Sequence, residues 1–488
     1  MKLIGILVLA AIALPAAEPD GALRKDAERA LERGVKFFSS EVAVHGTYLW
    51  QYSDDLSKRE GEGKATSMQA WVQPPGTPAV GMALLTAWQA TSNRLFLGVA
   101  RETARGLMGG QMRSGGWHYA IDFDPDARRK IAYRDGGGAG RARNVTTFDD
   151  DTTQAALRFL VRLDAALAFT DTNIAEAIEY ALNAIIKAQY PNGAWPQGYE
   201  QFPDPAQFPV RRASFPDEWP RTWPGAQQYW LRYTLNDNAL ATTVDTMFEV
   251  ARTYARPGAG KTRQELGKRS HAAALKAGDF LLFAQMPDPQ PAWAQQYDFE
   301  MRPSWARKFE PPSITAGESQ GALRLLLKLF RETGDRKYLE PVPRALDYLR
   351  RSRLPDGRLA RFYELRSNKP LYFTRDYTLT YDDTDMPTHY AFKIGDDTAP
   401  IARDYESLKN LSPAELKRPA TPSPPKASDA LRAEVRTIIA AQDTRGRWVE
   451  DGRLRHHGPD DSTTKVIRSA TFIRNVETLS RYLQATRE

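Results

Sequence analysis

The sequence contains no cysteine and only six histidines among its 488 residues. The lack of cysteine excludes disulfides, thiolate nucleophiles and thiolate metal sites. The histidines also lack the His-x-x-x-His spacing of a zinc-binding helix, and no glycine-rich phosphate loop follows an expected strand. A metal site would therefore depend mainly on oxygen ligands, which favour hard cations such as Ca²⁺ or Mg²⁺.

Long apolar runs are also scarce. The one present, Leu3 to Leu14, follows Lys2 and precedes the small residues Ala16 and Ala17. It falls short of the roughly 20 apolar residues that a transmembrane helix needs. We expect residues 1–17 to be a secretory signal peptide, with an uncleaved anchor as the alternative. The mature chain is then exported and has no stable membrane insertion.

The net charge of +7 is spread along the chain and does not concentrate in one block. Basic groups such as Arg350, Arg351 and Arg353 are typical of solvated helix ends. For an exported protein, a basic surface suits an acidic polymer better than DNA. We expect an acidic polysaccharide partner, no nucleic acid and a monomeric chain.

Apolar residues recur at helical spacing, as in Leu23, Ala27, Leu31 and Val35. Pairs of such helical runs end in turns that carry tryptophan. A two-helix unit repeated in this way predicts an all-α fold, an α/α toroid with irregular loops and short strands at its mouth; an irregular helical bundle is the alternative. The expected helices are Ala22–Ser39, Pro78–Gln89, Leu95–Met112, Asp151–Ala168, Ile174–Gln189, Ala239–Arg256, Gln264–Gln285, Glu318–Phe330, Lys337–Arg351, Asp429–Gln442 and Arg468–Gln484.

The same pattern predicts the organisation of the chain. After the signal peptide, residues 18–144 form N-terminal hairpins and residues 145–395 form the central part of the toroid. Prolines from Pro413 to Pro425 indicate an extended linker, placed at residues 396–427. Residues 428–488 form a C-terminal helical hairpin that completes the ring.

Acidic residues stand where helices are expected to begin. Asp149, Asp150 and Asp151 are consecutive and would repel one another unless a cation or an arginine compensates. Helix capping is the simpler alternative. We expect Asp149, Asp237 and Asp298 at equivalent places in successive hairpins, so that their carboxylates converge on the mouth.

Arginines in an aromatic setting follow these acids. Arg307 lies between Trp305 and Phe309 and is followed by Glu310. The pattern Ala-Arg-x-aromatic-Glu recurs at Arg361, and Arg375 comes shortly after. A surface arginine stacked on aromatic rings and paired with a glutamate is the alternative interpretation.

Six motifs in this order resemble the polysaccharide lyase family 10 pectate lyases, and the resemblance covers about Val145 to Gly395. The motifs are Asp149-Asp150 with Thr153, Gln189 to Gln197, Asn236 to Ala239, Gln295 to Asp298, Ala306 to Ser313 with Glu318-Ser319, and Arg361 to Glu364 with Arg375-Asp376.

The resemblance implies an α/α toroid that cleaves α-1,4-polygalacturonate by Ca²⁺-dependent β-elimination. It implies that Arg307 is the base that removes the C5 proton. Arginine has a pKa above about 12, so Arg307 must lose its proton transiently or act as an electrostatic clamp while another group accepts the proton. By the same resemblance, Asp149, Asp150 and Asp237 would bind the metal, and Arg361, Arg375, Asp298 and Trp195 would bind substrate.

Three other classes compete with this interpretation. A terpenoid cyclase-like α/α barrel shares glutamine-tryptophan turns, but Phe148 breaks its Asp-x-Asp-Asp-Thr motif. A non-catalytic toroid that binds acidic glycans would have no need of Arg307. An (α/α) glycoside hydrolase would need an acid of raised pKa opposite a carboxylate and no metal.

Overall fold

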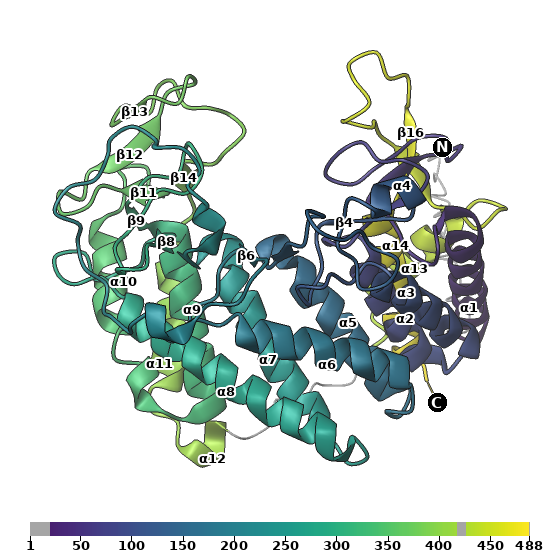
Figure 1. Ribbon diagram of the computed structural model, residues 1–488. Helices are drawn as coiled ribbons and strands as arrows, with labels where there is room; N and C mark the ends of the chain where they lie inside the picture. The colour runs from purple at the N-terminus through teal and green to yellow at the C-terminus, as the bar shows by residue number, and fades with distance from the viewer. Residues whose placement is uncertain (1–19, 417–425, 488) are drawn as a thin grey trace, which may run out of the picture.

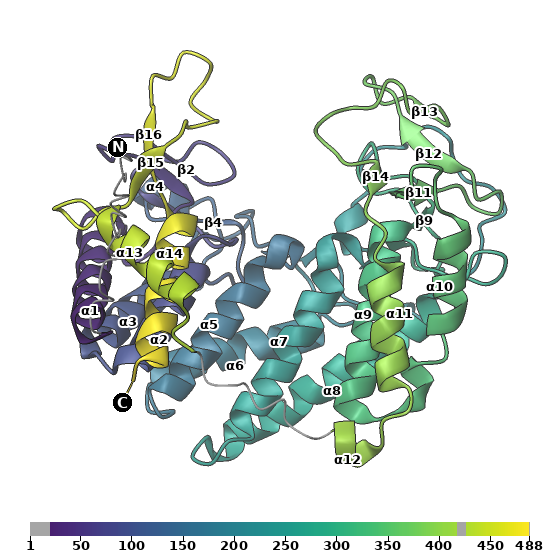
Figure 2. The same cartoon turned by 180° about the vertical axis from the view of Figure 1, so that it is seen from behind.

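The computed structural model describes residues 20–416 and 426–487, so the expected signal peptide lies outside the described residues. Its helices form two layers that curve along an arc (Figures 1 and 2). The inner layer follows the packing order α14 (Ser469–Ala485), α2 (Thr77–Thr91), α5 (Thr152–Ala166), α7 (Ala239–Tyr254), α9 (Ala316–Thr333) and α11 (Thr398–Leu408). The outer layer contains α13 (Asp429–Ala440), α1 (Asp20–Phe37), α3 (Arg94–Met108), α6 (Thr172–Lys187), α8 (Gly260–Ala284) and α10 (Val342–Arg351). The predicted α/α toroid class is confirmed.

The two layers differ in the pattern of their apolar residues. The outer helix α3 buries Phe96, Ala100 and Leu107 on one face and exposes its charged residues on the other. The inner helix α2 packs against helices on several sides and is apolar around most of its circumference. Gly81 of α2 leaves room for the ring of Phe159 on α5, because an added Cβ would lie 2.5 Å from that ring. Helical spacing therefore places each helix in its layer.

Four outer helices end in the same turn, which ties each hairpin to its neighbour. Gln189 donates hydrogen bonds of 2.9 Å to the carbonyls of Gly193 in its own turn and Ala273 in α8. The indole of Trp195 donates to the carbonyl of Ile185, also over 2.9 Å. The four glutamine-tryptophan pairs are Gln111 with Trp117, Gln189 with Trp195, Gln285 with Trp293, and Gln442 with Trp448.

Short antiparallel ladders join the start of each inner helix to the segment that follows its outer partner. They are β3 (Gln69–Trp71) with β4 (Ala120–Asp122), β5 (Thr146–Thr147) with β6 (Gly198–Tyr199), and β7 (Tyr233–Thr234) with β8 (Gln296–Tyr297). The strands and long loops lie along one edge of the arc, at the top of Figure 1, and we call this edge the mouth. The N-termini of the inner helices therefore point to the mouth.

Larger sheets stand over the two ends of the arc. One has the order β13-β12-β11-β9, the other β15-β16-β1-β2, and a separate pair joins β10 to β14. Their bounds are β1 (Gln51–Ser53), β2 (Arg59–Glu60), β9 (Ile314–Thr315), β10 (Leu359–Ala360), β11 (Phe362–Tyr363), β12 (Pro370–Phe373), β13 (Leu379–Thr380), β14 (Lys393–Ile394), β15 (Val449–Asp451) and β16 (Lys465–Arg468). The short helices α4 (Pro125–Arg128) and α12 (Pro413–Leu416) lie in connecting segments.

The structure corrects one expected boundary. The expected linker at residues 396–427 begins too early, because α11 forms within it and packs on α9 and α10. Ile401 and Leu408 are the buried residues that anchor this helix, and the charges between them weaken the apolar pattern in the sequence. Residues 417–425 lie outside the described residues.

The C-terminal hairpin α13–α14 packs on α1 and α2 at the N-terminal end of the arc. Within the described residues, no extensive packing joins α14 to α11, so the arc is open between these two helices. No described helix is both long enough and apolar enough to cross a bilayer.

Candidate active site

Two turns with the same backbone conformation carry the acids that precede α5 and α7. They are the 3-10 segments Asp149–Asp151 and Asn236–Asn238. Asp150 (φ 47°, ψ 37°) and Asp237 (φ 47°, ψ 33°) both adopt left-handed backbone conformations, which short polar side chains tolerate. Asp237 is thus the structural counterpart of Asp150, and the expected equivalence with Asp149 is wrong by one residue.

The two turns bring three carboxylates together. Oxygen atoms of Asp149, Asp150 and Asp237 all lie within 4.8 Å of one another. We call these three residues the aspartate cluster. Two residues of the N-terminal hairpins hold it: Tyr119 donates to Asp149 Oδ2 over 2.6 Å, and Gln73 donates to Asp150 Oδ2 over 2.9 Å. Of the three acids expected to converge on the mouth, Asp149 and Asp237 lie together in this cluster and Asp298 is not part of it.

The aspartate cluster carries more negative charge than Arg307 compensates. Desolvation and the charges of Asp149, Asp237 and Glu62 raise the pKa of Asp150 to about 7. Desolvation and the charge of Asp149 also raise the pKa of Asp237, although Arg307 opposes the shift. Oδ1 of Asp149 is buried and has no hydrogen-bond partner among the described residues. These hard oxygen donors fit a divalent cation such as Ca²⁺.

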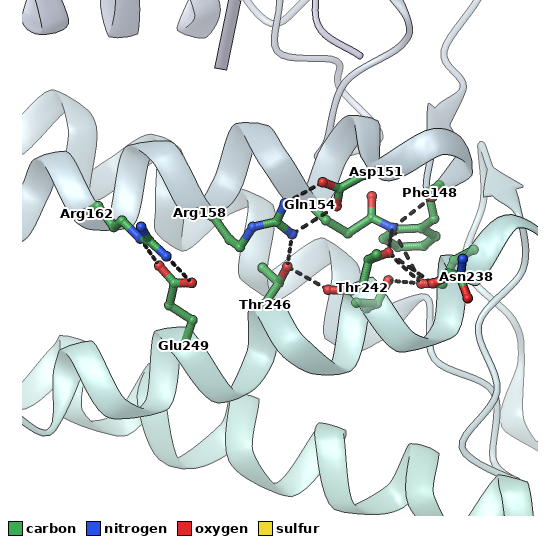
Figure 3. Close-up of polar contacts among 11 residues, drawn as sticks. Phe148, Asp151, Gln154, Arg158, Arg162, Asn238, Thr242, Thr246 and Glu249 are labelled. Carbon is green, nitrogen blue, oxygen red and sulfur yellow. Dashed lines mark hydrogen bonds and ion pairs between the residues drawn. The ribbon is translucent and has the colours of Figure 1, made fainter. Parts of the chain in front are cut away.

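A polar ladder between α5 and α7 fixes the relative position of the two turns (Figure 3). Buried Gln154 on α5 donates over 2.8 Å to the carbonyl of Phe148, just before the first turn. The same amide donates over 3.0 Å to Thr242 on α7. Thr242 in turn donates to the carbonyl of Asn238, at the end of the second turn, over 3.1 Å. One glutamine therefore links the starts of both helices.

The ladder continues along the helices. Arg158 on α5 donates over 2.9 Å both to Asp151 and to Thr246 on α7. One turn further, Arg162 forms a bidentate ion pair with Glu249, in which one contact is 3.0 Å (Figure 3). Asp151 is therefore neutralised by Arg158, which separates its role from that of the aspartate cluster.

Arg307 lies beside the aspartate cluster. Its Nη2 atom is 3.4 Å from Asp237 Oδ2 and 2.6 Å from Glu310 Oε1. Burial lowers the pKa of Arg307, but the hydrogen bond and charge of Glu310, with the charge of Asp237, outweigh burial and raise it. Its Nε atom is buried and has no hydrogen-bond partner among the described residues. In this state Arg307 is a protonated guanidinium whose buried Nε–H donor is unused.

Tyr390 connects Arg307 to a second arginine. The Tyr390 hydroxyl donates to Glu310 Oε1 over 3.1 Å. Arg361 lies over the Tyr390 ring, with its guanidinium carbon 4.5 Å from the ring centroid. Glu318 at the start of α9 is buried, and desolvation with the charges of Asp237 and Glu310 raises its pKa to about 7, although Arg361 opposes the shift. Arg361 therefore stands at the site, as predicted from the sequence.

Two of the residues predicted to bind substrate form contacts with other parts of the protein. Arg375 is exposed and pairs with Asp385 over 3.2 Å. Asp298 accepts hydrogen bonds from the backbone N–H groups of Glu300 and Arg302 within its own loop. That loop precedes β9 and is no helix start, so the expected equivalence of Asp298 with Asp237 is wrong.

The prediction that Trp195 binds substrate is also wrong. Trp195 is 1 % exposed and its indole N–H is held by the carbonyl of Ile185. A buried tryptophan in a repeated turn cannot present its ring to a sugar. Its role is to fix the hairpin.

Sequence reasoning missed several contributors to the site. Gln73 and Tyr119 lie before the region of resemblance and reach the cluster only because the first hairpin packs next to α5. Tyr390 and Glu318 act through contacts with the arginines and with Glu310. The Glu318-Ser319 motif was visible in the sequence, whereas nothing in it marks Tyr390.

Part of the chain is similar to a known family. Residues 111–330 match the model of the pectic acid lyase family. None of the curated proteins matches the chain.

Solved structures with a similar course of the chain include a family 10 polysaccharide lyase from Cellvibrio cellulosa. It is 20% identical, with a TM-score of 0.46, and the match covers 69% of this chain and 98% of that chain. A variant of the Cellvibrio lyase in complex with trigalacturonic acid gives the same identity and TM-score over 68% and 98% of the two chains. A family 76 α-mannanase from Bacteroides thetaiotaomicron is 10% identical, with a TM-score of 0.37 over 96% and 95% of the two chains.

The family match contains the whole aspartate cluster together with Arg307 and Glu310. The resemblance to the pectate lyases is therefore confirmed over this segment: residues 111–330 of the chain match the pectic acid lyase family, and this match supports a polysaccharide lyase.

Proposed function

We propose that this protein cleaves α-1,4-linked polygalacturonate by calcium-assisted β-elimination. The observation that carries the proposal is the meeting of the aspartate cluster with Arg307 at the mouth, where Arg307 lies 3.4 Å from Asp237. Elimination next to a carboxylate needs positive charge at that carboxylate and a proton acceptor near the adjacent carbon. The site offers oxygen ligands for a cation and guanidinium groups within a few side chains of each other.

The aspartate cluster would hold the cation. When bound there, Ca²⁺ supplies positive charge that neutralises the uronate carboxylate and stabilises negative charge as it develops at C5. Arg361 is placed to bind a uronate carboxylate, because its guanidinium fork matches the geometry of a carboxylate.

We assign the base to Arg307. Its deprotonated guanidine would accept the C5 proton, the electron pair of that C–H bond would form the C4–C5 double bond, and the C4–O bond would break. The released glycosidic oxygen takes a proton from solvent. Glu310 holds Arg307 protonated in the free site, so deprotonation requires other positive charge nearby. Arg361, whose guanidinium carbon lies 4.5 Å from the centroid of the Tyr390 ring, provides such charge.

We also propose that the protein acts outside the cytoplasm, since residues 2–17 have the charge and apolar pattern of a signal peptide. A basic chain of net charge +7 suits a polyanionic substrate at that location.

A substrate panel tests the proposal. The purified protein with Ca²⁺ is incubated with polygalacturonate, highly methyl-esterified pectin, alginate and a neutral glucan, and products are analysed by mass spectrometry. We expect unsaturated oligogalacturonides from polygalacturonate. Unsaturated products from alginate alone would show that the substrate contains another uronate. Saturated products from any substrate would show that the reaction is hydrolysis and not elimination.

A further inference from the structure

A basic pocket lies at the end of the arc that the family segment does not reach. Its volume is about 360 Å³. We call it the arginine pocket and define it by Trp50, Glu60, Arg453, Arg455, His456 and Arg468, which are among the residues that line it. All of these lie outside residues 111–330, in or beside the sheet β15-β16-β1-β2.

Two of its arginines have no carboxylate partner. Arg453 and Arg455 are exposed and form no ion pair or side-chain hydrogen bond within residues 20–416 and 426–487. The third, Arg468, is already paired with Glu450 and also donates to Gln51 over 3.0 Å. The free guanidinium groups are therefore available to an anionic ligand.

Glu60 belongs to the pocket but leaves these charges uncompensated. It is 2 % exposed, and its oxygens accept the backbone N–H groups of Arg455 over 3.1 Å and His456 over 2.9 Å. The amide of Gln51 donates to it as well. Its three partners are neutral donors, so Glu60 fixes the backbone that carries Arg455. A buried carboxylate that holds a loop in place is typical of a pre-organised site.

The pocket is connected to the aspartate cluster through one residue. The indole of Trp50 donates over 2.9 Å to the carbonyl of Gln73, and the Gln73 amide donates to Asp150. Trp71 donates to the Gln73 side chain over 3.1 Å and lies edge-on to Trp50, with ring centroids 6.3 Å apart. Both tryptophans are partly exposed, so apolar ring surface lies between the two sites. Sugar rings pack their C–H faces on such surfaces.

We propose that the arginine pocket is a second carboxylate-binding site, which holds a distant uronate unit of the same polysaccharide chain while another unit occupies the aspartate cluster. This inference rests on the proposed function, because it takes the same polyuronate as ligand. Guanidinium groups bind carboxylates bidentately, and the tryptophan pair gives the intervening sugars a surface to cross. The protein then prefers long chains over short oligomers.

Binding by an inactive parent tests this proposal. The parent is Arg307→Ala with Ca²⁺, and the ligands are fluorescently labelled trigalacturonate and labelled polygalacturonate at about 0.15 M salt, which screens weak surface attraction. The pocket variant adds Arg453→Ala and Arg455→Ala. The matched control adds Arg256→Ala and Arg436→Ala, which remove the same charge from two other exposed arginines with no partner in the described chain.

We expect the pocket variant to bind polygalacturonate about tenfold more weakly than the parent and to bind trigalacturonate equally well. The control should match the parent with both ligands, and melting temperatures should agree among all three. Unchanged polymer binding in the pocket variant would overturn the inference, as would an equal loss with both ligands or the same loss in the control. If the parent binds neither ligand, the proposed substrate is wrong and the inference falls with it.

Discussion

Glu310 holds Arg307 by its side chain and its backbone at once. Oε1 accepts from Nη2 of Arg307 over 2.6 Å, and Oε2 accepts from the Arg307 backbone N–H over 3.0 Å. With an exposure of only 2 %, Glu310 is a poorly solvated carboxylate, and its charge keeps the pKa of Arg307 above the ordinary arginine value. The same contact that positions the proposed base therefore opposes its loss of a proton.

Replacing Glu310 by Gln should expose this conflict. Glu310→Gln keeps an oxygen acceptor but removes the negative charge, so the pKa of Arg307 falls. If Arg307 is the base, the rising limb of the kcat profile should move to lower pH by at least about one unit, the scale of an opposite charge in direct contact. The profile is measured from the rate of unsaturated product between pH 7 and 11.

The control for that experiment is Tyr390→Phe, which removes the 3.1 Å contact to Glu310 without changing a carboxylate. It should leave the position of the rising limb unchanged. An altered kcat in Glu310→Gln with no movement of the limb would assign Arg307 to charge stabilisation and the proton transfer to another group.

Arg307→Ala should separate chemistry from binding. We expect kcat to fall by at least about 10³-fold, because both a base and a nearby positive charge are lost. Binding of trigalacturonate should weaken less than about tenfold, since the aspartate cluster and Arg361 remain. The two quantities are measured by product absorbance and by calorimetric titration. Retained turnover would contradict the assignment of the base.

Asp149 and Asp151 offer a matched test of the metal site, because they lie in one turn but only Asp149 belongs to the cluster. Asp149→Asn should weaken Ca²⁺ binding at least about tenfold in calorimetry, since its buried Oδ1 has no protein partner among the described residues. Asp151→Asn loses the contact with Arg158 and should cost about 1 kcal/mol of stability, with Ca²⁺ affinity nearly unchanged. Equal loss of affinity in both variants would contradict a site made by the cluster alone.

Glu318 should make the free energy of unfolding depend on pH. Its pKa is raised to about 7 in the folded state from 4.5, so the folded protein binds the extra proton between these values. Stability is then highest below pH 4.5 and falls as pH rises through 7, by about 3 kcal/mol in total. Glu318→Gln should remove that loss. The free energy of unfolding of the variant should therefore rise relative to that of the wild type between pH 5 and pH 8.

The measurement is urea unfolding in EDTA at both pH values, so that metal binding does not contribute. Glu179→Gln, an exposed position on α6, serves as the control and should show no such gain. A constant difference between Glu318→Gln and wild type across this pH range would show that the Glu318 carboxyl stays charged in the folded protein.

Sequence periodicity was sufficient for most of the helices, because apolar residues recur at helical spacing along each of them. It failed at α11, where only Ile401 and Leu408 anchor a charged helix. It also paired Asp149 with Asp237, whereas backbone conformation pairs Asp150 with Asp237. Asp149 and Asp237 still both belong to the aspartate cluster, since the ladder through Gln154 aligns the two turns.

Contacts between distant parts of the chain could not be predicted from the periodicity and motifs of the sequence. Gln73 meets Asp150 only because the first hairpin lies next to α5, and Tyr390 reaches Glu310 only through the fold of the loop after β13. The resemblance implied that Trp195 binds substrate, whereas its burial shows that it holds the turn together. Local pattern located the acids and Arg307; tertiary packing decided their partners.

The most direct test of the central claim is the ultraviolet absorbance of unsaturated product formed from polygalacturonate as the metal is removed and restored. With Ca²⁺ present, absorbance should rise steadily; EDTA should stop the rise, and excess Ca²⁺ should restore the initial rate. In Asp149→Asn the rise should require far more Ca²⁺. A rate unaffected by EDTA, or no rise with Ca²⁺ in the wild-type protein, would contradict calcium-assisted elimination at the aspartate cluster.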